Sequence, residues 1–261
     1  MRRIPTYVDG LDQLLQGGIP VGNSVLVTGA PGTMKTSIAY YVMYRNALRG
    51  EPGLYVSLKQ RRESLLHHMH GLGLQCEKTA GYLSILDLPG LLAKFPVDRG
   101  RPCLSLFKLF ALSIKRSFDY HLLVVDSLGA LGTIAMFRDF RREVFNLLRW
   151  LRSLDCTLIM LSDLPSAGRT GSDGPTAFSE HGEEYLADGI IHLRTSERED
   201  IGTQRQLRVV KMRGTRHDLG YHDLLFENGF RLIRTPTMAR SFSARFSRLA
   251  RSGESEEREV T

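Results

Sequence analysis

The segment Asn23-Ser-Val-Leu-Val-Thr28 is followed at once by Gly29-Ala-Pro-Gly-Thr-Met-Lys-Thr36, and these two segments decide the fold. The first is a short run rich in β-branched residues, a pattern typical of a buried strand. Residues 37–49 then have the pattern of a helix, which Gly50 ends. The order of strand, glycine-containing loop and helix predicts a loop that wraps a phosphate group.

The chemistry of such a loop gives each of its positions an expected role. Successive backbone N–H groups surround a β-phosphate, aided by the positive end of the helix. Lys35 is expected to pair with the β- and γ-phosphates and the Thr36 hydroxyl to bind Mg²⁺. Met34 departs from the usual pattern, because a glycine is expected just before the lysine. We predict contacts with the nucleotide from Gly29, Ala30, Pro31, Gly32, Thr33, Met34, Lys35 and Thr36.

A second candidate for the metal site is Asp126, which ends a largely apolar run over residues 120–126. A carboxylate at the end of a buried strand can hold Mg²⁺ through water while Thr36 binds the ion directly. A lone aspartate after an apolar run also commonly does no more than end a strand. The phosphate loop upstream favours the metal-binding interpretation.

The rest of the chain alternates between strand and helix patterns. We expect strands at 53–58, 120–126 and 156–162, and helices at 63–70, 104–117 and 140–154. This alternation predicts an α/β fold whose mostly parallel sheet is covered on both faces. Shorter strands at 189–194, 206–213 and 230–233 predict an antiparallel C-terminal extension. We expect one domain over residues 1–234, followed by a tail, 235–261, that is disordered or binds a partner.

The motifs resemble those of a known family, the KaiC-like branch of the RecA-type P-loop ATPases. The resemblance rests on Gly10-Leu-Asp-Gln-Leu-Leu-Gln-Gly-Gly-Ile-Pro20, Val125-Asp-Ser-Leu128, Glu183-Glu-Tyr-Leu-Ala-Asp188 and Lys211-Met-Arg-Gly-Thr-Arg-His217, together with the loop. It extends from about Thr6 to Ile233. It implies a RecA-like core that binds ATP and Mg²⁺.

The resemblance also implies self-assembly. Lys211 and Arg213 are two residues apart in a predicted strand, so their side chains share one face. In the family this motif faces the ATP of the next subunit in a ring, which implies a sensor and an arginine finger acting in trans. The expected partners are copies of the chain in a ring, with a hexamer as one size, and an unidentified protein. A basic face on an exposed hairpin is the simpler alternative.

The catalytic pattern is broken after the second predicted strand. Proteins that resemble RecA place acidic residues here to activate water, but this chain has Leu58-Lys59-Gln60-Arg61. Lysine is no carboxylate base, and Gln60 could only position a water molecule. Loss of a general base typically costs a factor of about 10² to 10⁴ in rate. We therefore expect ATP binding with slow hydrolysis, and a polar group that senses the γ-phosphate at Ser162 or Asp163.

Composition limits the remaining possibilities. The 261 residues carry a formal charge of +7 and three scattered cysteines, with no apolar run long enough to span a membrane. These features predict a cytoplasmic protein without disulfides. The alternative function is that of a DNA-binding recombination protein related to RecA and RadA, which would use the loop 165–175 and the arginines of the tail. That loop holds a single basic residue, Arg169, so nucleic acid is the less favoured partner.

Overall fold

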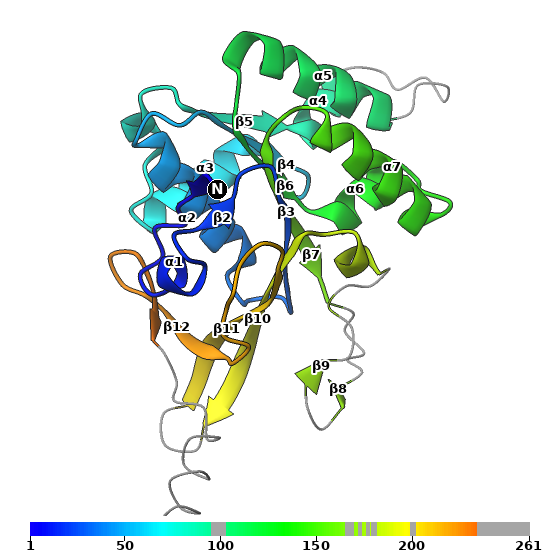
Figure 1. Cartoon of the computed structure of the whole chain (residues 1–261). Helices are drawn as coiled ribbons and strands as arrows, with labels where there is room; N and C mark the ends of the chain where they lie inside the picture. The colour runs from blue at the N-terminus through cyan, green and yellow to red at the C-terminus, as the bar shows by residue number, and fades with distance from the viewer. Residues whose placement is uncertain are drawn as a thin grey trace, which may run out of the picture.

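One large sheet with helices on both faces forms the core of the chain (Figure 1). The computed structural model describes residues 1–94, 103–164, 170–171, 174–175, 178, 182–198 and 202–233. The expected tail, 235–261, and most of the loop 165–175 lie outside the described residues. Within the described part, no helix is both long and apolar enough to cross a membrane.

The sheet has nine strands, six of them parallel. Their spatial order is β13 (Phe230–Ile233), β12 (His222–Phe226), β11 (Gly202–Met212), β10 (Gly189–Arg198), β3 (Ser24–Gly29), β7 (Thr157–Asp163), β6 (Leu122–Asp126), β4 (Gly53–Ser57) and β5 (Leu83–Asp87). The strands from β10 to β5 run parallel, and β11, β12 and β13 add to the edge in antiparallel pairs. The predicted fold class is confirmed, although β10 pairs in parallel with β3 and the antiparallel part begins only at β11.

The helices lie on both sides of this sheet (Figure 1). One side carries α1 (Leu11–Leu14), α2 (Lys35–Ala47) and α3 (Arg62–Gly71), and the other α4 (Leu88–Lys94), α5 (Cys103–Phe118), α6 (Leu128–Ile134) and α7 (Phe140–Arg152). Short elements complete the described chain: β1 (Arg3–Ile4), β2 (Ile19–Pro20), β8 (Thr170–Gly171), β9 (Gly174–Pro175) and the 3₁₀ turns η1 (Cys76–Thr79) and η2 (Glu183–Tyr185).

Strand alternation divides the core into two apolar clusters. On β3, Val25 and Val27 pack into the cluster that contains α2, whereas Leu26 packs into the cluster with α5 and α7. All three side chains are at most 4% exposed. Burial on both faces explains why the central strands read as continuous apolar runs. It also fixes the register of β3, because a shift by one residue would exchange the two faces.

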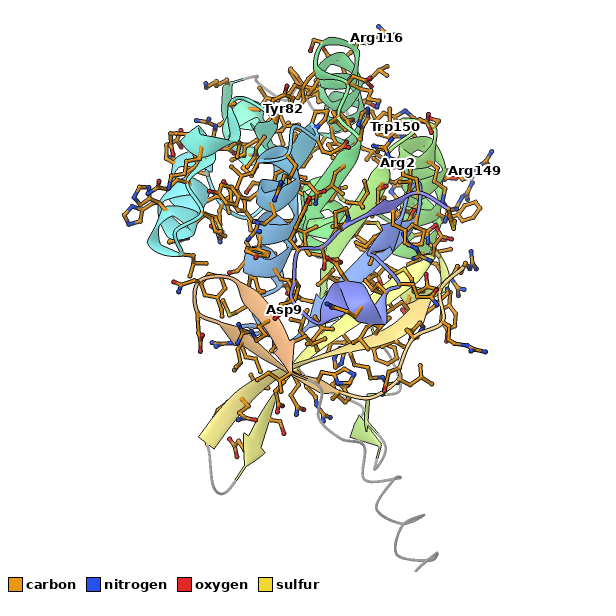
Figure 2. The ribbon with its side chains drawn as sticks, turned by 60° about the vertical axis from the view of Figure 1, so that its left-hand side comes forward. Arg2, Asp9, Tyr82, Arg116, Arg149 and Trp150 are labelled. Carbon is orange, nitrogen blue, oxygen red and sulfur yellow. The ribbon has the colours of Figure 1, made fainter. Side chains whose placement is uncertain are left out.

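Helix α7 shows how a surface helix is built from its sequence. Val144, Leu147 and Leu151 are buried at helical spacing, whereas Arg149 points away from the core (Figure 2). Trp150 packs on Phe107 of α5 with ring centroids 6.1 Å apart.

The N-terminus is fastened to a distant loop by Arg3. Its guanidinium donates to the carbonyl oxygens of Leu15 (2.9 Å), Gly18 (3.0 Å) and Gly214 (3.1 Å) and to the Thr215 hydroxyl (2.8 Å). The loop it reaches directly follows β11. One arginine therefore joins the first strand to the segment that carries the Lys211–His217 motif.

We predict that Arg3→Ala lowers the free energy of unfolding by about 2 kcal/mol, because hydrogen bonds donated by a charged group contribute more to stability than neutral ones. Arg2→Ala is the matched control, since Arg2 pairs with Glu51 at the surface and such pairs contribute at most about 1 kcal/mol. Urea unfolding followed by circular dichroism measures both. Equal losses in the two variants would contradict the role assigned to Arg3.

Candidate nucleotide-binding site

A cleft of 420 Å³ lies where the carboxyl ends of four parallel strands meet. In register, Gly29 at the end of β3 lies beside Asp163 at the end of β7, and Ser57 at the end of β4 lies beside Asp126 at the end of β6. The cleft is lined by Pro31, Gly32, Thr33, Met34, Lys35, Thr36, Ser37, Lys59, Gln60, Asp126, Ser127, Leu161 and Asp163. The structure thus brings the predicted loop, the predicted metal-binding aspartate and the Lys59–Gln60 pair together.

The start of α2 is shaped to receive an anion. The first amides of any helix have no partner within the helix, and the N-cap residue here, Met34, makes no side-chain hydrogen bond to them. The loop itself is held by Thr33, whose hydroxyl donates to the Ala30 carbonyl at 2.8 Å, and by Arg205 of β11, whose Nε donates to the Gly32 carbonyl at 3.2 Å. Open amides and the helix dipole together form a phosphate-binding arrangement. Nothing in the sequence pattern singled out Arg205.

Met34 adopts the backbone conformation for which glycine is usually required. Its φ of 69° and ψ of 28° are left-handed. This conformation costs an ordinary residue about 1 to 2 kcal/mol. The methionine side chain packs against the cluster that contains α2, a contact that a glycine could not make. Met34 therefore replaces the expected glycine in the sequence but keeps the left-handed backbone conformation that the glycine would adopt.

The Lys35 ammonium is saturated with acceptors. It donates to the carbonyl oxygens of Gly29 (2.7 Å) and Ala30 (2.9 Å), and its nitrogen lies 3.0 Å from Oδ1 of Asp163. An ammonium has three donors. A phosphate oxygen therefore reaches Lys35 only by displacing one of these acceptors.

Thr36 and Asp126 form the candidate magnesium site. The Thr36 hydroxyl donates to Oδ2 of Asp126 at 2.8 Å, which places two oxygen ligands of the kind Mg²⁺ prefers side by side. The buried Tyr55 hydroxyl donates to the same carboxylate oxygen at 2.8 Å. Burial, and then the charge of Asp126, raise the pKa of Tyr55 well above its ordinary value, so the phenol remains a donor. The donor set fits Mg²⁺ with Thr36 and Asp126 as its protein-derived ligands.

The position expected to activate water holds a cation that is already paired. Lys59 follows β4 and forms an ion pair with Oδ2 of Asp163. Gln60 lies beside it, with its Oε1 3.3 Å from Nδ1 of His68. Glu63, an acid further along the chain, is exposed on α3 and does not line the cleft.

Lys211 and Arg213 lie at the amino ends of the parallel strands, opposite the cleft at their carboxyl ends. Lys211 donates to the Ala187 carbonyl at 2.6 Å, and Arg213 pairs with Asp188 at 2.8 Å. Asp188 also accepts from the amide of Ser24, the first residue of β3. Since β3 spans roughly 16 Å at 3.3 Å per residue, this pair lies far from the loop at the other end of the strand. Partial burial, and then Arg213, lower the pKa of Lys211.

The sheet order, the loop and the carboxylate at the end of β6 together define a RecA-type P-loop protein. The family model of the KaiC ATPase matches residues 4–233, and the chain belongs to this family.

Two curated relatives show how much of the chain is shared. A UPF0273 protein of Methanopyrus kandleri is 30% identical over 231 residues, which cover 85% of this chain and 88% of the relative. The circadian clock oscillator protein KaiC of Picosynechococcus sp. is 30% identical over 243 residues, but the match covers only 43% of that protein. The chain thus spans less than half the length of the clock protein it matches.

A solved structure agrees with these matches. The crystal structure of a KaiC-like protein from Pyrococcus horikoshii OT3 superposes with a TM-score of 0.72 and 29% identity. The superposition covers 89% of this chain and 99% of that protein. The described fold is therefore similar to that protein over almost its whole length.

We predict that Met34→Gly is more stable than Met34→Ala by about 1 kcal/mol, because both lose the same packing but only glycine adopts a left-handed backbone without strain. The comparison reverses the usual order, in which alanine is the better helix residue. Thermal and urea unfolding of the two variants provide the measurement. An alanine variant as stable as the glycine variant would contradict the strain assigned to this position.

Proposed function

We propose that the chain binds Mg·ATP at Gly29–Thr36, hydrolyses it slowly and acts as an ATP-dependent regulatory switch. The observation that carries the proposal is a well-formed phosphate loop beside a strand end that presents Lys59 in place of a carboxylate. Family membership supports nucleotide binding, and the Thr36–Asp126 contact supports Mg²⁺. Residues 1–234 form one ATPase domain in this proposal.

The roles of the loop follow from its geometry. The amides at the start of α2 bind the phosphates, Lys35 neutralises their charge, and Thr36 and Asp126 hold the metal. Bound Mg²⁺ would neutralise further charge on the phosphates. Gln60 positions a water molecule at most, because an amide takes up no proton. The slow hydrolysis follows from this missing base.

Self-assembly is the second part of the proposal. Lys211 and Arg213 lie too far from the phosphate loop of their own chain, so they would act on the ATP of a neighbouring copy. A ring, with a hexamer as one size, places every such pair against a nucleotide. The loop 165–175, on which the DNA-binding alternative would depend, lies mostly outside the described residues. A cytoplasmic location fits the free cysteines and remains a prediction.

We expect wild-type protein to bind Mg·ATP and to turn it over well below about 1 s⁻¹, the lower end of typical enzyme rates. Lys35→Ala should lose binding, because the cation that faces the phosphates is removed. Lys59→Glu should hydrolyse saturating ATP about tenfold faster or more by restoring a base, whereas Lys59→Gln should not. Phosphate release measures the rates and calorimetry the binding; brisk wild-type turnover would contradict the slow switch.

The trans role predicts that ATP, but not ADP, increases the assembled mass of the wild type. Arg213→Ala should reduce this ATP-dependent assembly at least about tenfold, since a desolvated arginine–phosphate pair contributes more than about 1.4 kcal/mol. Arg116→Ala is the control, because Arg116 is exposed on α5 (Figure 2). Light scattering after size exclusion gives the mass. Assembly that is indifferent to nucleotide or to Arg213 would contradict this part of the proposal.

A further inference from the structure

Three charged side chains that line the cleft, Lys35, Asp163 and Lys59, contact one another. Oδ1 of Asp163 lies 3.0 Å from Nζ of Lys35, and Oδ2 of the same carboxylate pairs with Nζ of Lys59. One anion is thus shared between two cations that come from different parts of the chain. Asp163 ends β7 and Lys59 follows β4, so the sheet order creates the contact.

We propose that Lys59 is a ligand of the terminal phosphate and that Asp163 holds its place until a nucleoside triphosphate binds. This pair would make the site distinguish a triphosphate from a diphosphate. The inference rests on the proposed ATP binding and adds to it the group that recognises the γ-phosphate.

The balance of charge supports this assignment. Lys35 and Lys59 supply two positive charges, and Asp163 supplies one negative charge between them. Partial burial alone would raise the pKa of Asp163, but hydrogen bonds from Lys59 and Lys35 lower it below its ordinary value, so the carboxylate stays ionised. The other carboxylate of the cleft, Asp126, already accepts from Thr36 and Tyr55. The cleft as a whole therefore holds two positive and two negative side chains, but Asp126 belongs to the candidate magnesium site. Around Asp163 the two lysines leave one positive charge in excess, which a phosphate can match.

The acceptors of Lys35 indicate what a ligand would displace. Two are backbone carbonyl oxygens of the loop itself, fixed by the turn that follows β3. The third is Asp163, a side chain that is 41% exposed. A phosphate bound to Lys35 would therefore take the place of Asp163, because the side chain moves more readily than the loop backbone.

The position of Lys59 suits contact with the γ-phosphate, the last phosphate of the nucleotide. Lys35 opens α2 and is the cation that reaches the β- and γ-phosphates in loops of this kind. Lys59 lies across the cleft, one carboxylate group away from Lys35. A diphosphate that engages Lys35 leaves Lys59 paired with Asp163, whereas a third phosphate can replace that carboxylate for both lysines.

The simpler interpretation is a surface ion pair without a functional role. Lys59 and Asp163 are 45% and 41% exposed, and exposed pairs contribute about 0 to 1 kcal/mol to stability. Such a pair would have no reason to affect nucleotides of different length differently. The ratio of triphosphate to diphosphate affinity therefore separates the two interpretations.

The test is calorimetric binding of Mg·ADP and of the magnesium complex of the β,γ-imido analogue of ATP to the full chain. Lys59→Gln should weaken binding of the triphosphate analogue about tenfold or more, as expected for loss of a charged hydrogen bond, and binding of ADP less than about twofold. Asp163→Asn should strengthen binding of the analogue, because its anionic competitor is removed. Lys78→Gln, at an exposed lysine outside the cleft, controls for net charge.

The outcomes are distinguishable. If Lys59→Gln binds both nucleotides in the wild-type ratio, Lys59 is no γ-phosphate ligand and the inference is overturned while ATP binding stands. If the wild type binds neither nucleotide, or Lys35→Ala binds as well as the wild type, the proposed function itself fails and the inference falls with it. A melting temperature for each variant shows whether it is folded, and Lys59→Gln alone decides the matter if Asp163→Asn does not fold.

Discussion

The parallel pairing of β3 with β7 is the constraint on which the site depends. It places Gly29, where the phosphate loop begins, directly beside Asp163. The next pairings, β7 with β6 and β6 with β4, bring Asp126 and the residues after Ser57 to the same edge. Apolar side chains on both faces of β3 hold this register. The chemistry of the cleft is therefore fixed by packing in the interior of the sheet.

Sequence alone predicted those parts of the molecule whose signals are local. The loop and the start of α2 carry their own turn and helix signals, so Lys35 and Thr36 could be placed without knowledge of the fold. Asp126 was singled out as the last residue of an apolar run in a chain that also carries a phosphate loop. The mostly parallel sheet also followed, because alternating strands and helices leave few other arrangements.

The contacts between strands could not be predicted in the same way. Tyr55 reads as one more apolar residue of β4, and only the pairing of β4 with β6 shows that its hydroxyl meets Asp126. The Lys59–Asp163 pair depends likewise on which strands are neighbours. Helix α4 was missed because Pro89 is a poor helix former, yet proline is tolerated in a first turn, where no amide donor is needed.

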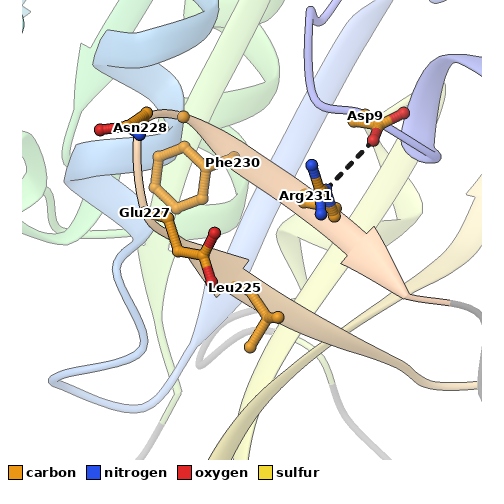
Figure 3. A pocket seen from close by; sticks show the side chains of 7 residues that line it. Asp9, Leu225, Glu227, Asn228, Phe230 and Arg231 are labelled. Carbon is orange, nitrogen blue, oxygen red and sulfur yellow. Dashed lines mark ion pairs between the residues drawn. The ribbon is translucent and has the colours of Figure 1, made fainter.

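The hairpin of β12 and β13 closes the far edge of the sheet and carries a second hollow, lined in part by Phe230 and by the ion pair between Arg231 and Asp9 (Figure 3). Asp9 and Arg3 thus anchor the first residues of the chain at two separate places. Arg3 has the wider effect of the two, since it donates hydrogen bonds to Gly214 and Thr215 in the loop after β11. Because Arg3 holds this loop two residues from Met1, a bulky group joined ahead of Met1 would lie beside the segment that is proposed to meet a neighbouring copy, so assembly is better measured without one.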